Sequence, residues 1–172
     1  ELIGRTGLLC GDDGRYLGSR FQLLPEDSPP AAATVELARH AAEQAAVAGY
    51  SGPLGIDVLQ YRDADGAASV RPLMDINPRL TMGRLSLALA HLLEPGEGGS
   101  WLHVVQRSRQ PSGIEPQPEN EVAGWRVVAT SPEETAFGPV QRQTFAVLAR
   151  SAAARQQAEQ QLLAGAYCPR SG

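Results

Sequence analysis

The sequence predicts an α+β fold: an antiparallel sheet with packed helices, extended by a small strand-and-helix lobe. Short runs rich in β-branched and aromatic residues are joined in pairs by turns that contain Asp and Gly, as in β-hairpins. Alanine- and leucine-rich segments, whose apolar residues recur at helical spacing, lie next to these pairs. A chain of 172 residues is also long enough to bury a sizeable core.

The first predicted element is a hairpin of residues 2–10 and 15–24, joined by the turn sequence Gly-Asp-Asp-Gly. Arg5 and Arg20 lie on this hairpin. They either reach phosphates or, in the favoured interpretation, remain exposed strand charges. A polar, Pro-rich connector over residues 25–33 follows.

A helix is predicted over residues 34–48. Thr34 is a residue type that caps helix N-termini, and Gly49 stands where a helix commonly ends in a left-handed residue. His40 lies among polar positions, so we expect it at the surface. The apolar stripe of this helix consists of Ala38, Ala41, Ala45 and Ala48.

A second hairpin is predicted from residues 55–61 and 68–76, joined by an Asp- and Gly-containing turn over 62–66. Pro72 interrupts its second strand. Because proline has no N–H to donate to a strand partner, we expect Pro72 at a sheet edge or at a β-bulge.

Polar side chains gather at the open end of this second hairpin. Asp75 and Asn77 are two residues apart and share a strand face, and Asp57 comes to lie across from them if the strands pair around the turn. Carboxylate and amide oxygens are the ligands that Mg²⁺ prefers. Arg79, just beyond the strand, carries a planar guanidinium that suits a phosphate or carboxylate.

A simpler interpretation of the same residues is a turn, because Asn-Pro and neighbouring Asp residues are common turn signals. The combination favours a site instead. Asp57 lies inside the apolar run Ile-Asp-Val-Leu, where a carboxylate is costly to bury unless it is paired or bound to a metal.

The segment Gly55-Ile-Asp57 and the segment Asp75-Ile-Asn77-Pro-Arg79 together resemble the ATP-grasp superfamily of ligases, with Asp75 in place of the family's usual Glu. The match covers about residues 1–93 and is specific over 49–83. The resemblance implies that Asp57, Asp75 and Asn77 hold Mg²⁺, or Mn²⁺, on the phosphates of ATP. It also implies that Asn77 and Arg79 bind the cofactor phosphates, and that Arg79 is catalytic through contact with the transferred phosphate.

The function implied by the resemblance is an ATP-dependent ligase that joins a small-molecule carboxylate to an amine or a thiol through an acyl phosphate. In that superfamily an N-terminal subdomain supplies lysines and the adenine contacts. This sequence has no Lys and begins at Glu1, so we expect a C-terminal fragment that contributes the Mg-ATP phosphate half-site and is inactive alone. The N-terminal subdomain is then the expected partner, and the surface left for it is expected to favour a homodimer.

Two alternatives remain open. One is a non-catalytic ATP-grasp-like domain that binds a nucleotide or a partner, which would suit the Asp75 replacement. The other is a structural α+β domain in which Asp-x-Asn is only a turn.

A second helix is predicted over residues 82–93. Backbone N–H groups at a helix start favour anions, so Thr81, Gly83 and Arg84 are candidates for binding the substrate carboxylate. An ordinary helix cap is an equally good interpretation of Thr81.

The predicted domains are an ATP-grasp-like subdomain over residues 1–95 and an appended region over 96–172, with a flexible Pro-rich loop at 110–121. Ser151 is expected to cap the last helix. The further elements expected after the second helix are a Gly-rich loop at 94–100, a strand or short helix at 101–107, strands at 125–130 and 144–150, a helix at 151–163 and a frayed tail at 167–172.

The composition excludes several partners. A net charge of −4, from 15 basic and 19 acidic residues, does not fit a nucleic-acid-binding protein. No apolar run approaches the ~20 residues of a membrane span, and no signal-peptide pattern opens the chain, so a cytoplasmic protein without a membrane partner is expected. Cys10 and Cys168 have no metal-ligand spacing and are expected to be free thiols.

Overall fold

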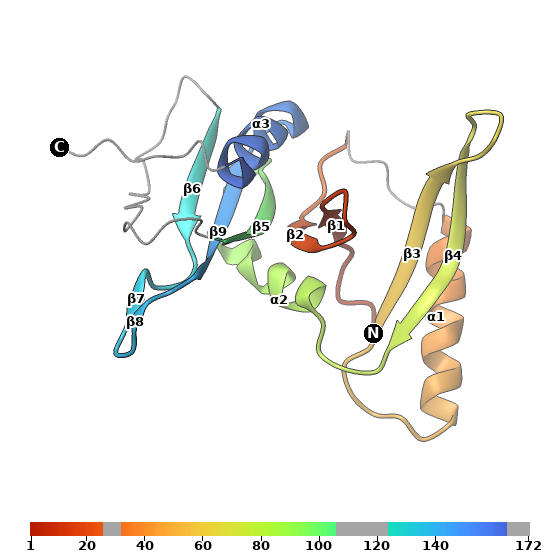
Figure 1. Ribbon diagram of the computed structural model, residues 1–172. Coiled ribbons are helices and arrows are strands. Elements are labelled where there is room, and N and C mark those ends of the chain that lie inside the picture. Colours follow the sequence, from red (N-terminus) through yellow and green to blue (C-terminus); the bar gives the residue numbers. More distant parts are fainter. Residues whose placement is uncertain (26–31, 106–123, 165–172) are drawn as a thin grey trace. The chain divides into compact units, whose positions relative to one another are not determined.

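The computed structural model describes residues 1–25, 32–105 and 124–164 (Figure 1). The predicted α+β class is confirmed at that level, because the described residues form antiparallel strand pairs together with three α-helices. The predicted loop at 110–121, Cys168 and the tail at 167–172 lie outside the described residues. In the part of the chain that is described, no helix is long and apolar enough to cross a membrane.

The chain divides into two compact units. The hairpin unit comprises Glu1–Gly4 and Ser28–Leu85, and the five-stranded unit comprises Arg5–Asp27 and Ser86–Gly172. This division differs from the predicted ranges 1–95 and 96–172. The cause is that the first hairpin pairs with a strand near residue 100 rather than with the second hairpin.

The hairpin unit consists of one helix and one two-stranded sheet (Figure 1). An isolated hairpin is marginally stable in water, and here the packing of the helix against β4 adds the missing support. The elements are α1 (Ala32–Val47), β3 (Gly55–Arg62) and β4 (Ala68–Asn77).

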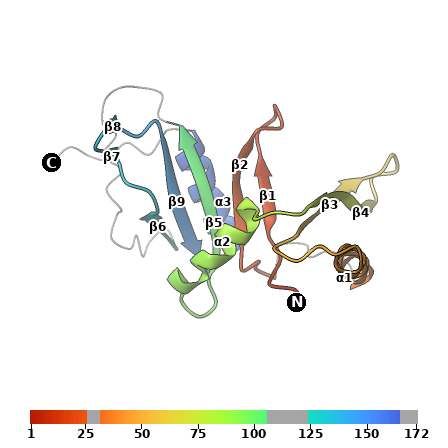
Figure 2. The same ribbon diagram turned by 90° about the horizontal axis from the view of Figure 1, so that it is seen from below.

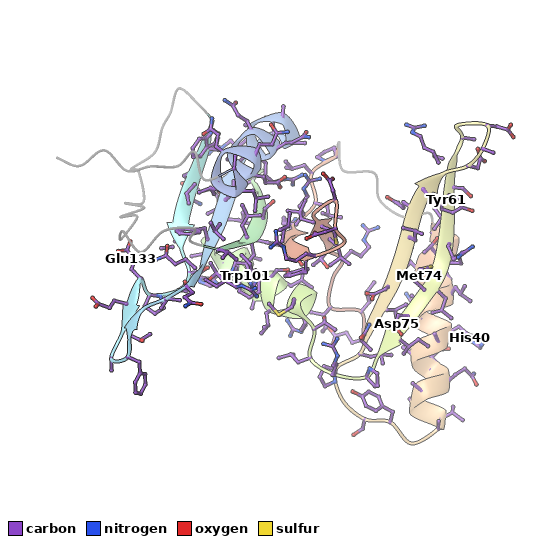
Figure 3. All side chains as sticks on the ribbon, in the orientation of Figure 1. His40, Tyr61, Met74, Asp75, Trp101 and Glu133 are labelled. Atoms are coloured by element: carbon purple, nitrogen blue, oxygen red, sulfur yellow. The ribbon has the colours of Figure 1, made fainter. Side chains whose placement is uncertain are left out.

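Two predictions about α1 have different outcomes. The prediction that Thr34 caps the helix is wrong: α1 begins at Ala32, and Thr34 lies buried within its first turn. The prediction for Gly49 is confirmed, since its φ of +92° lies in the left-handed region just beyond the helix. His40 is at the surface as expected, with 63% of its side chain exposed (Figure 3).

The five-stranded unit is built on one sheet. Its strands follow the order β1 (Gly7–Cys10), β2 (Tyr16–Phe21), β5 (Gly98–Val105), β9 (Arg142–Ala149) and β6 (Trp125–Ala129). A Gly-rich loop was predicted at 94–100, but its last three residues belong to a strand, because β5 begins at Gly98. Gly99 lies beneath the ring of Phe21 on β2, where a Cβ would collide with the ring, so only glycine fits. Strands β7 (Glu134–Thr135) and β8 (Gly138–Pro139) form a separate small pair.

Helical segments cover both faces of this sheet (Figure 2). Helix α3 (Ala152–Leu163) packs on one face, over a core centred on Phe145 and Val147. The 3-10 helix η1 (Leu89–Leu92) and the end of α2 (Met82–Ala88) pack on the other. The predicted appended lobe is thus part of a sheet with two buried faces.

Helix α3 begins as predicted, because the Ser151 hydroxyl accepts a hydrogen bond from the backbone N–H of Ala154.

The inner face of α3 carries a buried ion-pair network. Glu159 accepts two hydrogen bonds from Arg20, at 2.9 and 2.6 Å, and one from the Ser100 hydroxyl, and it lies 3.5 Å from Arg155. The expectation that Arg20 is an exposed strand charge or a phosphate ligand is therefore replaced by a structural role.

Candidate metal and phosphate site

The second hairpin places the predicted site residues in register. Strand β3 pairs with β4 so that Gly55 lies opposite Asn77 and Asp57 lies directly opposite Asp75. Directly opposed residues of antiparallel strands share a face, and so do residues two apart. The two carboxylates and the amide therefore project from one face of the hairpin, at the end away from its turn. Figure 3 shows Asp75 at that end, with Tyr61 nearer the turn.

A register irregularity adjoins this cluster. Asp57 pairs with Asp75, whereas Leu59 pairs with Arg71, so residues 72–74 of β4 stand against the single residue Val58 of β3. Pro72 lies within this irregularity, as predicted from its missing N–H. Bulges increase the local twist and re-aim neighbouring side chains, and here the affected neighbour is Asp75.

Hydrogen bonds connect three of the four predicted residues. The Asn77 Nδ2 group donates to Oδ2 of Asp57 at 3.2 Å, and Oδ1 of Asn77 accepts from Nη2 of Arg79 at 3.1 Å. The carboxylate of Asp75 accepts from the backbone N–H of Ile76 at 2.9 Å. The structure thus brings Asp57, Asn77 and Arg79 into contact and sets Asp75 across the ladder from Asp57.

The electrostatics of this face are unusual for a hairpin, because two like charges lie directly opposite each other. Such a pair destabilises a sheet by about 0.2–1 kcal/mol. Asp57 is half-buried and Asp75 is exposed, and within the described residues neither carboxylate forms an ion pair. No group of three or more His, Cys, Asp and Glu side chains that could hold a metal occurs among them either. The third predicted ligand, Asn77, is of another type.

The predicted substrate residues lie at the start of helix α2. The Thr81 hydroxyl accepts from the backbone N–H of Arg84 at 3.3 Å, and the Thr81 carbonyl accepts from Leu85 at 3.2 Å. Thr81 is therefore the N-cap of α2, which matches the ordinary-cap interpretation. Gly83 lies in the first turn of this seven-residue helix, and the Arg84 side chain is exposed.

Gly55 has a role in the site region that was not predicted from the sequence. A Cβ at this position would lie 2.5 Å from Cγ2 of Thr81, closer than side chains tolerate. Glycine therefore lets Thr81 sit beside the strand position that pairs with Asn77. The signal in the sequence was a glycine at the start of an otherwise apolar strand, where it weakens the strand unless another chain segment approaches closely.

Comparison of the chain with models of known protein families finds no match, and a search of curated proteins finds no significant relative.

Proposed function

We propose that the hairpin unit contributes the Mg-ATP phosphate half-site of an ATP-grasp-type ligase. The observation that carries this proposal is the direct pairing of Asp57 with Asp75 on the strand face that Asn77 shares, with Arg79 hydrogen-bonded to Asn77. A pair of unneutralised carboxylates destabilises the free hairpin, so a bound cation would convert a repulsion into an attraction.

The donor set fits Mg²⁺ or Mn²⁺. Asp57, Asp75 and the amide oxygen of Asn77 are hard oxygen donors, and Mg²⁺ is usually bound by one or two carboxylates together with substrate phosphates and water. A cation held by these residues would supply positive charge that neutralises the charge developing on the phosphates during phosphoryl transfer. Asp75 is exposed, which leaves room on its side for phosphate oxygens.

Arg79 would bind the transferred phosphate. Among the described residues, its guanidinium donates one side-chain hydrogen bond, from Nη2 to Asn77, and makes a long 3.5 Å contact with the carbonyl of Leu80. In the proposed reaction a carboxylate oxygen attacks the γ-phosphorus and ADP leaves. An amine or thiol then displaces phosphate from the acyl phosphate, and Arg79 stabilises the phosphate charge in both steps.

The ligase proposal also includes an N-terminal ATP-grasp subdomain as the partner that supplies adenine contacts and lysines. The hairpin exposes large apolar side chains, including Tyr61 and Met74 (Figure 3). Four of them are between 41% and 47% exposed: Leu59, Tyr61, Leu73 and Met74. Large exposed apolar side chains of this kind are what a docking partner would cover.

Paramagnetic NMR with Mn²⁺ tests the half-site. Broadening centred on Asp57, Asp75 and Asn77 is expected in the wild-type chain, and Asp75→Ala should abolish it. Asp65→Ala is the matched control, because Asp65 is an exposed carboxylate in the turn at the opposite end of the same hairpin. Broadening that is equal in wild type and Asp75→Ala would refute the site.

A second candidate is a non-catalytic ATP-grasp-like domain that binds a nucleotide or a partner. It is favoured by Asp75, which stands where the superfamily has Glu. The two candidates differ once the chain is joined to a subdomain with adenine and lysine contacts. A ligase then forms ADP in the presence of its carboxylate, whereas a binding domain retains ATP unchanged.

A further inference from the structure

The orientation of the Asn77 amide is determined by its two partners. A carboxylate only accepts hydrogen bonds, so the side of the amide that faces Asp57 must be its NH₂ group. A guanidinium only donates, so the side that faces Arg79 must be the amide oxygen. The reverse assignment would place two donors together at Arg79 and two acceptors together at Asp57.

This orientation is incompatible with Asn77 acting as a cation ligand beside Asp57. Cation binding through Asn77 requires its oxygen on the side of the carboxylates, where the NH₂ group now lies. Turning the amide over would bring the NH₂ group to Arg79. The hydrogen bond to Nη2 would then be lost, because a donor would face a donor.

We propose that Asn77 is a positioning residue that makes the availability of Arg79 depend on the cation site, an inference that rests on the proposed function. Without a cation, the amide holds the guanidinium of Arg79. Reversal of the amide, as its oxygen turns to the cation, frees Arg79 for an anionic phosphate. Phosphate binding through Arg79 therefore follows cation binding.

The neighbouring groups do not provide the same coupling. Asp75 accepts from the backbone of Ile76 and, within the described residues, forms no hydrogen bond with the Asn77 amide, so it can bind a cation without moving Arg79. The remaining contact of Arg79, with the carbonyl of Leu80, is long at 3.5 Å and exposed. Loss of the Asn77 bond is thus the main change that Arg79 undergoes.

The experiment follows the Asn77 side-chain amide and the Arg79 Nε–H signal by ¹⁵N NMR while Mg²⁺ and inorganic triphosphate are added separately and together. In the wild-type chain, Mg²⁺ alone should shift both signals. Triphosphate should shift Arg79 strongly only after Mg²⁺ is present. Arg79→Gln should abolish the triphosphate response, whereas Arg39→Gln, which alters an exposed arginine on α1, should keep it.

Two substitutions at Asn77 give opposite expectations. Asn77→Ala releases Arg79, so triphosphate should bind about three- to tenfold more tightly than to wild type in the absence of Mg²⁺, as expected for one lost hydrogen bond. Asn77→Asp instead pairs Arg79 with a carboxylate, so triphosphate should bind more weakly than to wild type even with Mg²⁺. A merely structural role for Asn77 would weaken cation-free triphosphate binding in both variants.

The failure of this inference is distinguishable from failure of the proposed function. If Mg²⁺ shifts Asp57 and Asn77 but leaves Arg79 unchanged, or if Asn77→Ala does not strengthen cation-free binding, the coupling is refuted and the half-site stands. If Mg²⁺ shifts none of these residues in wild type, both proposals are refuted.

Discussion

The carboxylates of the two units differ in how many hydrogen bonds and ion pairs they receive. In the five-stranded unit, Glu159 is 3% exposed and is surrounded by donors: two hydrogen bonds from Arg20, one from Ser100 and an ion pair with Arg155. In the hairpin unit, Asp57 and Asp75 face each other across a strand pair and receive no ion pair within the described residues.

The difference separates a carboxylate that serves the fold from carboxylates that are available to a ligand. A buried charge is tolerable only when partners compensate its lost hydration, and the bonds of Glu159 do so. The hairpin carboxylates are half-buried or exposed and retain coordination capacity. In the proposed site a cation would use that capacity, whereas at Glu159 it would have to displace two arginines.

The largest effect is expected at the buried network. Glu159→Ala should destabilise the five-stranded unit by about 3–5 kcal/mol, because it removes the carboxylate that Arg20 and Arg155 share. Urea unfolding measures the change. The control is Glu43→Ala on α1, whose carboxylate is exposed, and it should change stability by less than about 0.5 kcal/mol. Equal small losses in both variants would remove the contrast between the units.

A smaller effect is expected where the hairpin meets Thr81. Gly55→Ala should cost about 1–3 kcal/mol, because the new Cβ would lie 2.5 Å from Cγ2 of Thr81. Thermal unfolding of the single variant and of Gly55→Ala combined with Thr81→Ser measures the coupling. The serine lacks Cγ2, so the double variant should recover most of the loss. An additive result would show that the close approach does not limit this position.

Acidification should destabilise the five-stranded unit through His103. Burial, and to a lesser extent the positive charge of Arg142, lower the pKa of His103 below its usual value of 6.5. A lowered pKa contributes stability that is present above the unfolded-state value and is lost as pH falls through the folded-state value. The loss is about 1.4 kcal/mol for each unit of pKa shift.

Unfolding free energies measured from pH 8 downwards test this step. His103→Gln should remove the dependence that begins near pH 6.5, the reference value for histidine. His40→Gln is the control, because the exposed ring of His40 lies on α1 of the other unit. A slope that persists unchanged in His103→Gln would assign the acid sensitivity to other groups.

The smallest effect is expected for the opposed carboxylates of the hairpin unit. Asp75→Asn should stabilise the hairpin unit by about 0.2–1 kcal/mol when divalent cations are chelated, because it removes the repulsion from Asp57. With Mg²⁺ present, the variant should lose that advantage over wild type. Asp65→Asn, at the turn, should show neither change. Measurements of thermal unfolding with and without Mg²⁺ distinguish the three proteins.

Local patterns were enough to predict the site region. The turn chemistry of residues 62–66 and the alternation of side chains placed Asp57 opposite the segment of Asp75 and Asn77, and the register confirms this placement. Pro72 was placed at an irregularity because its missing N–H is a property of the residue itself. The Ser151 cap and the left-handed Gly49 were predictable for the same reason.

The strand that pairs with the first hairpin could not be predicted from the sequence. Nothing within β2 specifies that it pairs with β5, some 80 residues later, because many strands present equivalent backbone donors and acceptors. The ion pair between Arg20 and Glu159, 139 residues apart, depends on that pairing and on the docking of α3. The Asn77–Arg79 hydrogen bond likewise needed side-chain geometry.

The second hairpin, its turn, its bulge and the residue types of the candidate cation and phosphate site were thus predictable from neighbouring residues alone. Three features became visible only in the folded chain: which strands share a sheet, which charges are buried in pairs, and that the Asn77 amide faces Asp57 with its nitrogen. The cause is the separation along the chain over which each kind of interaction acts. Propensity, turn chemistry and strand alternation act between neighbours in the chain, whereas sheet partners and buried ion pairs depend on which distant segments exclude water together.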